Sequence, residues 1–296
     1  MTHEHHDHRP VHLDESDWRA WADHATLEGE VLLAFVTGAA TRVAALRGDG
    51  APPVRRVLDV GAGPGVGTCE LARIFPEAEV IAVDASPAML ERAEQRAAGL
   101  GLGDRVRTHL AELPGGLDAV GPADVIWASM SLHHVGDEVA ALRVLGAALA
   151  PGGLLAVVEM GDPLRVLPDD LDVGRPGLAD RLDRVGAAWF SAMRAGLPGT
   201  VPSADLPAMI HDAGLDVVAA DTVTEHQGAP LGAGARRLAL EHLRRTQERF
   251  TAEELDGDDV SALATLTDPD DPRGAARRAD LILRTSRQVV IARRRT

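Results

Sequence analysis

The chain has 296 residues and a net charge of −15, with 45 acidic residues against 30 basic ones, all of them arginine. This acidic balance opposes binding to a phosphate backbone, so we expect no nucleic-acid partner. The single cysteine, Cys69, excludes an internal disulfide, and neither a leader segment nor an apolar span of membrane length is apparent. We therefore expect a cytoplasmic protein that does not contact a membrane.

The N-terminal part divides into a histidine-rich start and a helical segment. Residues 1–13 carry several histidines and are expected to be disordered; such a tract can also hold a metal loosely. No other cluster has the spacing of a closed metal site, so we expect no metal. Residues 14–50 show helical apolar spacing, in one helix through Trp18 and Trp21 and a second over Val31–Leu46.

A strand, a glycine turn and a helix start follow one another after residue 50. Val54–Val60 is apolar and β-branched, which predicts a buried strand, and Thr68–Phe75 predicts a helix. Three glycines between them let a ligand approach the backbone and the free N–H groups of the helix. The spacing Asp-x-Gly-x-Gly-x-Gly from Asp59 fits neither the dinucleotide fingerprint nor a phosphate loop. Without further motifs, a purely structural turn remains an alternative.

A second strand, Ala78–Val83, ends in Asp84. A carboxylate at a strand tip about 20 residues after the glycine turn is placed to accept hydrogen bonds from a ribose diol. Ser86 and Pro87 then read as the cap and first residue of a helix that continues through Met89. The alternative is that Asp84 is an ordinary acid at a helix N-terminus.

The rest of the chain alternates between strand and helix patterns, which favours a parallel, doubly wound sheet. Strands are predicted at 105–110, 123–130, 151–159, 215–224 and 287–293, and helices at 138–150, 178–193, 206–213 and 233–250. Residues 251–278 are acidic and read as loop-rich. The helix over 233–250 is expected to expose one charged face, comprising Arg236, Glu241, Arg244, Arg245 and Glu248.

Four ordered motifs resemble the class I S-adenosylmethionine-dependent methyltransferases. They are Asp59–Gly65, Val83–Leu90, Ser131–Asp137 and the Pro151-Gly152-Gly153 turn. The third, Ser-Leu-His-His-Val-Gly-Asp, resembles the ubiquinone- and menaquinone-type small-molecule methyltransferases. The resemblance implies a Rossmann-like, doubly wound seven-stranded α/β sheet, mostly parallel with an antiparallel last strand. Residues 14–50 would form a lid, and residues 51–296 the S-adenosylmethionine-binding domain, with helical insertions at about 160–212 and 228–284.

The resemblance also implies site residues. Those expected to bind S-adenosylmethionine are Asp59, Gly61, Ala62, Gly63, Gly65, Asp84, Ala85, Met89, Ala111, Glu112, Ala128 and Ser129. Where the family has an acid that meets the adenine amine, this chain has His109 or Leu110, and Glu112 is the nearest acid. Candidate substrate-binding residues are Trp18, Trp21, Trp189 and Met193, although packing in the core explains the tryptophans equally well.

His133 and His134 lie where the fourth strand runs out into a loop and are the candidate catalytic residues. A histidine titrates near neutrality and can deprotonate an acceptor, while the alternative is a structural role. The predicted function is methyl transfer from S-adenosylmethionine to an oxygen, nitrogen or carbon atom of a small molecule. A non-catalytic cofactor-binding module, or the same fold used for another reaction, remains open, as does the oligomeric state.

Overall fold

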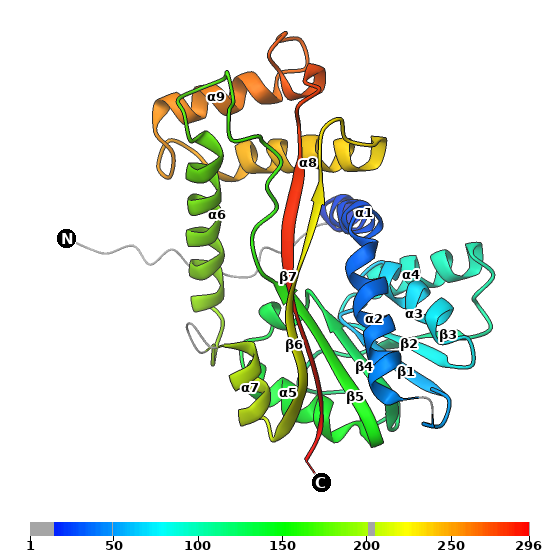
Figure 1. Cartoon of the computed structure of the whole chain (residues 1–296). Coiled ribbons are helices and arrows are strands. Elements are labelled where there is room, and N and C mark those ends of the chain that lie inside the picture. The colour runs from blue at the N-terminus through cyan, green and yellow to red at the C-terminus, as the bar shows by residue number, and fades with distance from the viewer. Residues whose placement is uncertain (1–14, 49, 201–204, 296) are drawn as a thin grey trace.

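The computed structural model describes residues 15–48, 50–200 and 205–295, so the histidine-rich start lies outside the described residues. A seven-stranded sheet in the order β3-β2-β1-β4-β5-β7-β6 forms its centre (Figure 1). The strands are β1 Arg56–Val60, β2 Glu79–Asp84, β3 Val106–Leu110, β4 Ala123–Ser129, β5 Leu149–Met160, β6 Leu215–Gln227 and β7 Leu283–Arg294. Strands β1 to β5 pair in parallel, and β7 runs antiparallel between β5 and β6. The predicted sheet is confirmed, including its antiparallel last strand.

Helices cover both faces of this sheet because successive strand residues point to opposite sides. The helices are α1 Glu15–Val31, α2 Leu33–Arg47, α3 Val66–Ile74, α4 Pro87–Gly99, α5 Glu138–Ala147, α6 Leu178–Ala195, α7 Leu206–Asp212, α8 Ala233–Arg249 and α9 Gly257–Thr267, with short 3₁₀ turns η1 Leu132–His134 and η2 Ala275–Arg277. Along β1, Val57 packs in a core with α2, α3 and α4, whereas Leu58 packs in a core with α5 and α7. Each face therefore has its own apolar layer.

A further group of helices, α6, α8 and α9, lies beyond one end of the sheet (Figure 1). Its own apolar core includes Leu182 from α6, Leu243 from α8 and Leu263 from α9. Helix α1 joins this group to the sheet, because Leu27 packs in one cluster with Leu238 of α8. The group thus stands over the end of the sheet at which the glycine turn emerges.

Residues 251–278, predicted to be loop-rich within a helical insertion, contain an α-helix that the sequence analysis did not identify. Helix α9 begins after Asp256, whose carboxylate accepts hydrogen bonds from the N–H groups of Asp258 and Asp259. Acids at a helix start are stabilised by its free N–H groups and its dipole, so the acidic run is a helix signal here. Strand β7 also begins earlier than predicted, at Leu283.

No single helix within the described ranges is both long enough and apolar enough to cross a membrane. Residues Arg19–Val31 and Leu33–Arg47 meet the length and composition requirement only as a pair, and that pair is bent by 62°. Among the same residues, no three histidine, cysteine or acidic side chains gather in a group able to hold a metal.

Candidate active site

The glycine turn after β1 uses its glycines for two different purposes. Gly61, Gly63 and Gly65 all have positive φ, of 71°, 53° and 80°. A Cβ atom at Gly61 would lie 2.3 Å from Cβ of Ser131, and one at Gly65 would lie 2.6 Å from Cβ of Ala93. A Cβ atom at Gly63 would meet nothing within 4 Å. Two glycines therefore allow close packing, and the middle one leaves open space above the turn.

Asp59, near the end of β1, is a buried carboxyl group with a single side-chain partner among the described residues. It is 3% exposed, and the Thr68 hydroxyl donates a 2.6 Å hydrogen bond to its Oδ2. Burial raises the pKa of Asp59 to about 7, the Thr68 hydrogen bond opposes this, and the charge of Asp84 adds to it. The group is therefore held close to the point at which it ionises at physiological pH.

Asp84, at the tip of β2, connects the glycine turn with the start of α4. Its Oδ2 accepts a 2.9 Å hydrogen bond from the Gly63 N–H, and its Oδ1 accepts one of 2.9 Å from the Ser86 N–H. Ser86 in turn caps α4 by accepting a hydrogen bond from the Met89 N–H, as predicted. Each carboxylate oxygen keeps a further lone pair for a ligand.

A cavity of about 390 Å³ opens where β1 and β4 end. The predicted residues that line it are Asp59, Gly61, Ala62, Gly63, Ser129, His133, His134 and Trp21. Helix α1 supplies one wall, including His24 and Glu28, and α8 supplies another. The sheet end, the N-terminal helix and the C-terminal helices thus meet around one cavity.

Several predicted residues do not line this cavity, namely Gly65, Asp84, Ala85, Met89, Ala111, Glu112, Ala128, Trp189 and Met193. Some of them gather on the β2–β3 side of the turn, where the Ala111 N–H donates to the Asp84 carbonyl. Met89 and Ala128 are instead core residues, 2% and 0% exposed. Trp18 belongs to α1, but its side chain lies outside the part of the chain that the structure describes.

His133 forms a dyad with Glu159 of β5, a partner that the sequence analysis did not identify. The distance from His133 Nδ1 to Glu159 Oε2 is 2.6 Å. The other oxygen of Glu159 accepts hydrogen bonds from the N–H groups of Ser131 and Leu132, at 3.0 and 2.8 Å. With the carboxylate fixed at the start of η1, Nδ1 of His133 carries the proton and Nε2 has the free lone pair.

His134 lies beside this dyad but has different electrostatics. The ring centroids of His133 and His134 are 4.1 Å apart. His134 remains partly exposed; its partial burial lowers the pKa of the ring to about 4, the charge of His133 acts in the same direction, and that of Glu159 opposes the change. The ring is therefore neutral at physiological pH.

Helix α8 contributes Arg245 and Arg249 to the cavity wall, together with His242. The prediction that Arg245 belongs to the solvent-exposed face is wrong, because α8 packs between α1 on one side and α6 and α9 on the other and therefore has two covered sides. The only sequence feature that drew attention to Arg245 was its pairing with Arg244. That pairing does not identify a cavity residue, because Arg244 faces solvent and Arg245 faces the cavity.

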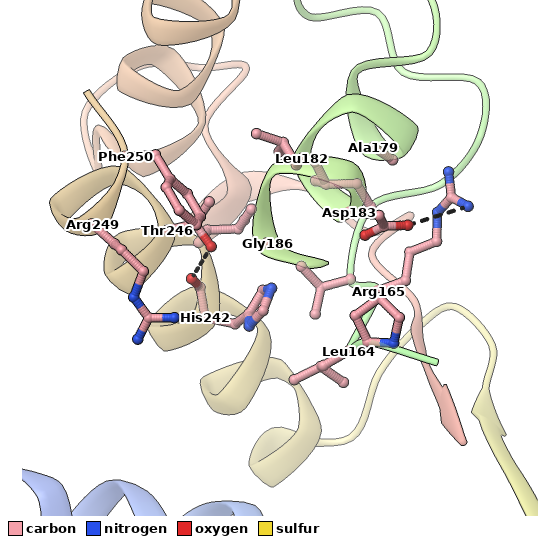
Figure 2. Close-up of a pocket in the computed structure, with 14 residues that line it drawn as sticks. Leu164, Arg165, Ala179, Leu182, Asp183, Gly186, His242, Thr246, Arg249 and Phe250 are labelled. Carbon is pink, nitrogen blue, oxygen red and sulfur yellow. Dashed lines mark hydrogen bonds and ion pairs between the residues drawn. The ribbon is translucent and has the colours of Figure 1, made fainter. Parts of the chain in front are cut away.

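A smaller cavity of about 80 Å³ adjoins the large one between α6 and α8, and Figure 2 shows its lining. His242, Thr246 and Arg249 line both cavities. Apolar side chains such as Leu182 and Phe250 form much of the remaining wall. Trp189, predicted to contact substrate, packs against Arg249, whose guanidinium carbon lies 4.0 Å from the ring centroid.

Comparison with known proteins gives concordant matches. A family model described as a methyltransferase domain matches residues 58–155. The 27-O-demethylrifamycin SV methyltransferase of Amycolatopsis mediterranei is 31% identical over 205 residues, which are 66% of this chain and 69% of that protein. A trans-aconitate 2-methyltransferase of Methylobacterium radiotolerans is 36% identical over 152 residues, 47% of this chain.

The shared region is shorter than many of the relatives themselves. The chain spans 56% of the Methylobacterium protein and 39% of a second trans-aconitate 2-methyltransferase, from Variovorax paradoxus. A solved Bacillus halodurans C-125 structure, provisionally named a methyltransferase, shares the fold with a TM-score of 0.51 and 14% identity, covering 87% of this chain and 99% of that one. On the rifamycin relative and the matching domain model, the chain belongs to the class I S-adenosylmethionine-dependent methyltransferases, whose cofactor is S-adenosylmethionine.

Proposed function

We propose that this protein transfers the methyl group of S-adenosylmethionine to a small-molecule acceptor bound in the 390 Å³ cavity. The observation that carries the proposal is that one cavity brings together the glycine turn after β1 and His133 after β4, whose ring is paired with Glu159 of β5. The segment Ser131–Asp137 supports an acceptor chemistry like that of the ubiquinone- and menaquinone-type enzymes. The net charge of −15 favours a small molecule over a nucleic acid.

The residues around the turn fit the cofactor. Gly63 leaves open space above the turn, and Asp84 offers two oxygens to ribose hydroxyls. Asp59 places a carboxyl group in the wall of a cavity that would take a ligand with a positive charge. When bound, S-adenosylmethionine supplies an activated methyl group on a sulfonium.

The role we assign to His133 is that of general base. Glu159 orients the ring through Nδ1, so Nε2 is the atom that accepts a proton from the methyl acceptor. His134 remains neutral beside it and does not add a second positive charge. Methyl transfer also depends on alignment, which supplies on the order of 7–11 kcal/mol when reactants are held in line.

Apolar side chains from the helices support exclusion of water from the reaction. Leu32 and Phe35 are each 5% exposed and line the cavity, where Trp21 of α1 joins them. Residues 14–50 would then serve as the lid. Trp189 and Met193 of α6 would act at the acceptor side, Trp189 through its contact with Arg249.

The direct test is calorimetry with S-adenosylmethionine and S-adenosylhomocysteine, followed by incubation of labelled cofactor with a metabolite extract. We expect binding of both and a labelled small-molecule product. Binding without any transfer would favour a non-catalytic module, and an unmethylated product would favour a different reaction on the same fold. Failure of both ligands to bind at millimolar concentration would contradict the proposal.

A further inference from the structure

Two arginines in the cavity wall, Arg245 and Arg249, stand four residues apart on α8. Within the described ranges, neither forms an ion pair, although the chain has 45 acidic residues for its 30 arginines. Arg244, on the solvent side of the same helix, pairs with Glu248 at 3.4 Å. In the part of the chain that the structure describes, Arg245 and Arg249 are thus left without a carboxylate partner in a protein that has a surplus of acidic residues.

The local electrostatics are unfavourable unless an anion is added. Arg249 remains partly exposed; its partial burial lowers the pKa of the guanidinium, and the charge of Arg245 lowers it further. The Nε atom of Arg245 is buried and has no hydrogen-bond partner among the described residues. Arg287, the third arginine of the cavity, differs because it donates to Glu28 at 3.1 Å. An oxyanion bound between the two guanidinium groups would accept hydrogen bonds from their terminal N–H groups and offset their charge.

The two cavities also fix where such an anion would lie relative to the rest of a ligand. Trp189 holds the guanidinium of Arg249 by stacking against it at 4.0 Å. In Figure 2 this guanidinium points away from Leu182 and Phe250, which form part of the apolar wall of the 80 Å³ cavity; the Arg165–Asp183 ion pair lies elsewhere in the same wall. An anionic group and an apolar group of one ligand therefore find matching surroundings side by side.

We propose that Arg245 and Arg249 bind a carboxylate of the methyl acceptor, and that an apolar part of the same molecule enters the adjoining cavity. The guanidinium fork matches the two oxygens of a carboxylate. This assignment rests on the proposed function, because it defines the acceptor class for the same site.

The test uses the full chain with S-adenosylhomocysteine present and phenylacetate as the probe. Its neutral isostere, phenylacetamide, reports the contribution of the charge, and phenylphosphonate distinguishes carboxylate from phosphate-type oxyanions. Each compound is titrated to about 20 mM and its binding followed by saturation-transfer NMR, since fragments of this size bind in the millimolar range. We expect saturable binding of phenylacetate, about tenfold tighter than that of phenylacetamide.

Single substitutions on α8 test whether the preference for phenylacetate over phenylacetamide depends on Arg245 and Arg249. Arg245→Gln and Arg249→Gln should each abolish the preference for phenylacetate, whereas Arg244→Gln, on the same helix, should leave it unchanged. Arg249→Lys keeps the charge without the fork and should retain a reduced preference. Thermal unfolding and S-adenosylhomocysteine affinity, measured for every variant, establish that the fold and the cofactor site are intact.

The outcomes separate this inference from the proposed function. Absence of a charge preference in the wild type, or its survival in both glutamine variants, would overturn the arginine site while cofactor binding stands. Tighter binding of phenylphosphonate than of phenylacetate would overturn the carboxylate assignment. Failure of the wild type to bind S-adenosylhomocysteine would instead contradict the proposed function. In that case, titration of phenylacetate and phenylacetamide without S-adenosylhomocysteine would still test the arginine pair.

Discussion

Replacing Asp59 with asparagine should make the protein more stable and its cofactor site weaker. The pKa of Asp59 is raised from 3.8 to about 7, so the fold favours the protonated carboxyl group. The penalty for ionising it is absent below about pH 4, grows as the pH rises, and is complete above about pH 7. Three pKa units correspond to about 4 kcal/mol of unfolding free energy.

Asparagine does not ionise, and its amide oxygen can still accept the hydrogen bond from Thr68. We therefore expect Asp59→Asn to exceed the wild type in stability by up to about 4 kcal/mol near pH 8, with the difference vanishing toward pH 4. Urea unfolding across this range measures it. Tryptophan fluorescence is a suitable probe, because Trp127, one of the four tryptophans, is 0% exposed and paired with Asp59 in the sheet.

The reasoning fails if the difference between the two proteins does not change with pH. It also fails if the variant is the less stable one near pH 8, because the apoprotein would then stabilise the carboxylate. In parallel, calorimetry should show that affinity for S-adenosylmethionine falls by about one to two orders of magnitude, since the variant lacks the carboxyl group that we propose as a partner of the positively charged cofactor.

Three further predictions concern single side chains. Asp84→Ala removes the acceptor that we propose for the ribose hydroxyls and the partner of the Gly63 and Ser86 N–H groups, so S-adenosylhomocysteine affinity should fall by about one to two orders of magnitude in calorimetry; an unchanged dissociation constant would contradict this. His133→Asn should lower kcat by about 10²–10⁴-fold and remove the acidic limb of the pH–rate profile while cofactor affinity stays the same; weaker cofactor binding at an unchanged kcat would indicate a structural role. Burial lowers the pKa of His242 from 6.5 to about 4, so this group contributes stability above about pH 6.5 that is lost as the pH falls toward 4. When the pH falls from 6.5 to 4, the unfolding free energy of His242→Gln should therefore decrease by about 2–3 kcal/mol less than that of the wild type, as measured by urea unfolding. Equal decreases in the two proteins would exclude His242 as the source of the pH dependence.

The sheet and the cofactor were predictable because their signals are local. An apolar strand, the glycines from Gly61 to Gly65 and Asp84 follow one another within a short stretch, and each needs only its neighbours in sequence to be recognised. The family match confirms the cofactor prediction. Helix α9 was missed because its capping acid, Asp256, stands among other acids that also occur in loops.

The cavity was predictable only in part because its walls come from distant segments. Glu159 is separated by 26 residues from His133, and nothing in the sequence of β5 marks it as the partner of that ring. Arg245 and Arg249 face the cavity because α1 and α6 cover opposite sides of α8, an arrangement that helical periodicity does not reveal. The roles of these side chains follow from tertiary packing.

The position of β7 has a consequence for how the molecule is built during synthesis. The five parallel strands and the glycine turn precede residue 161, whereas β7 spans Leu283–Arg294 and pairs with β5 on one side and β6 on the other. Pairings between such distant segments form late, because the intervening chain must first be ordered. A nascent chain can thus assemble strands β1 to β5 and the glycine turn early, whereas α8 can take its place in the cavity wall only after β7 has paired. Ribosome-bound intermediates should accordingly bind cofactor before they are able to retain an acceptor.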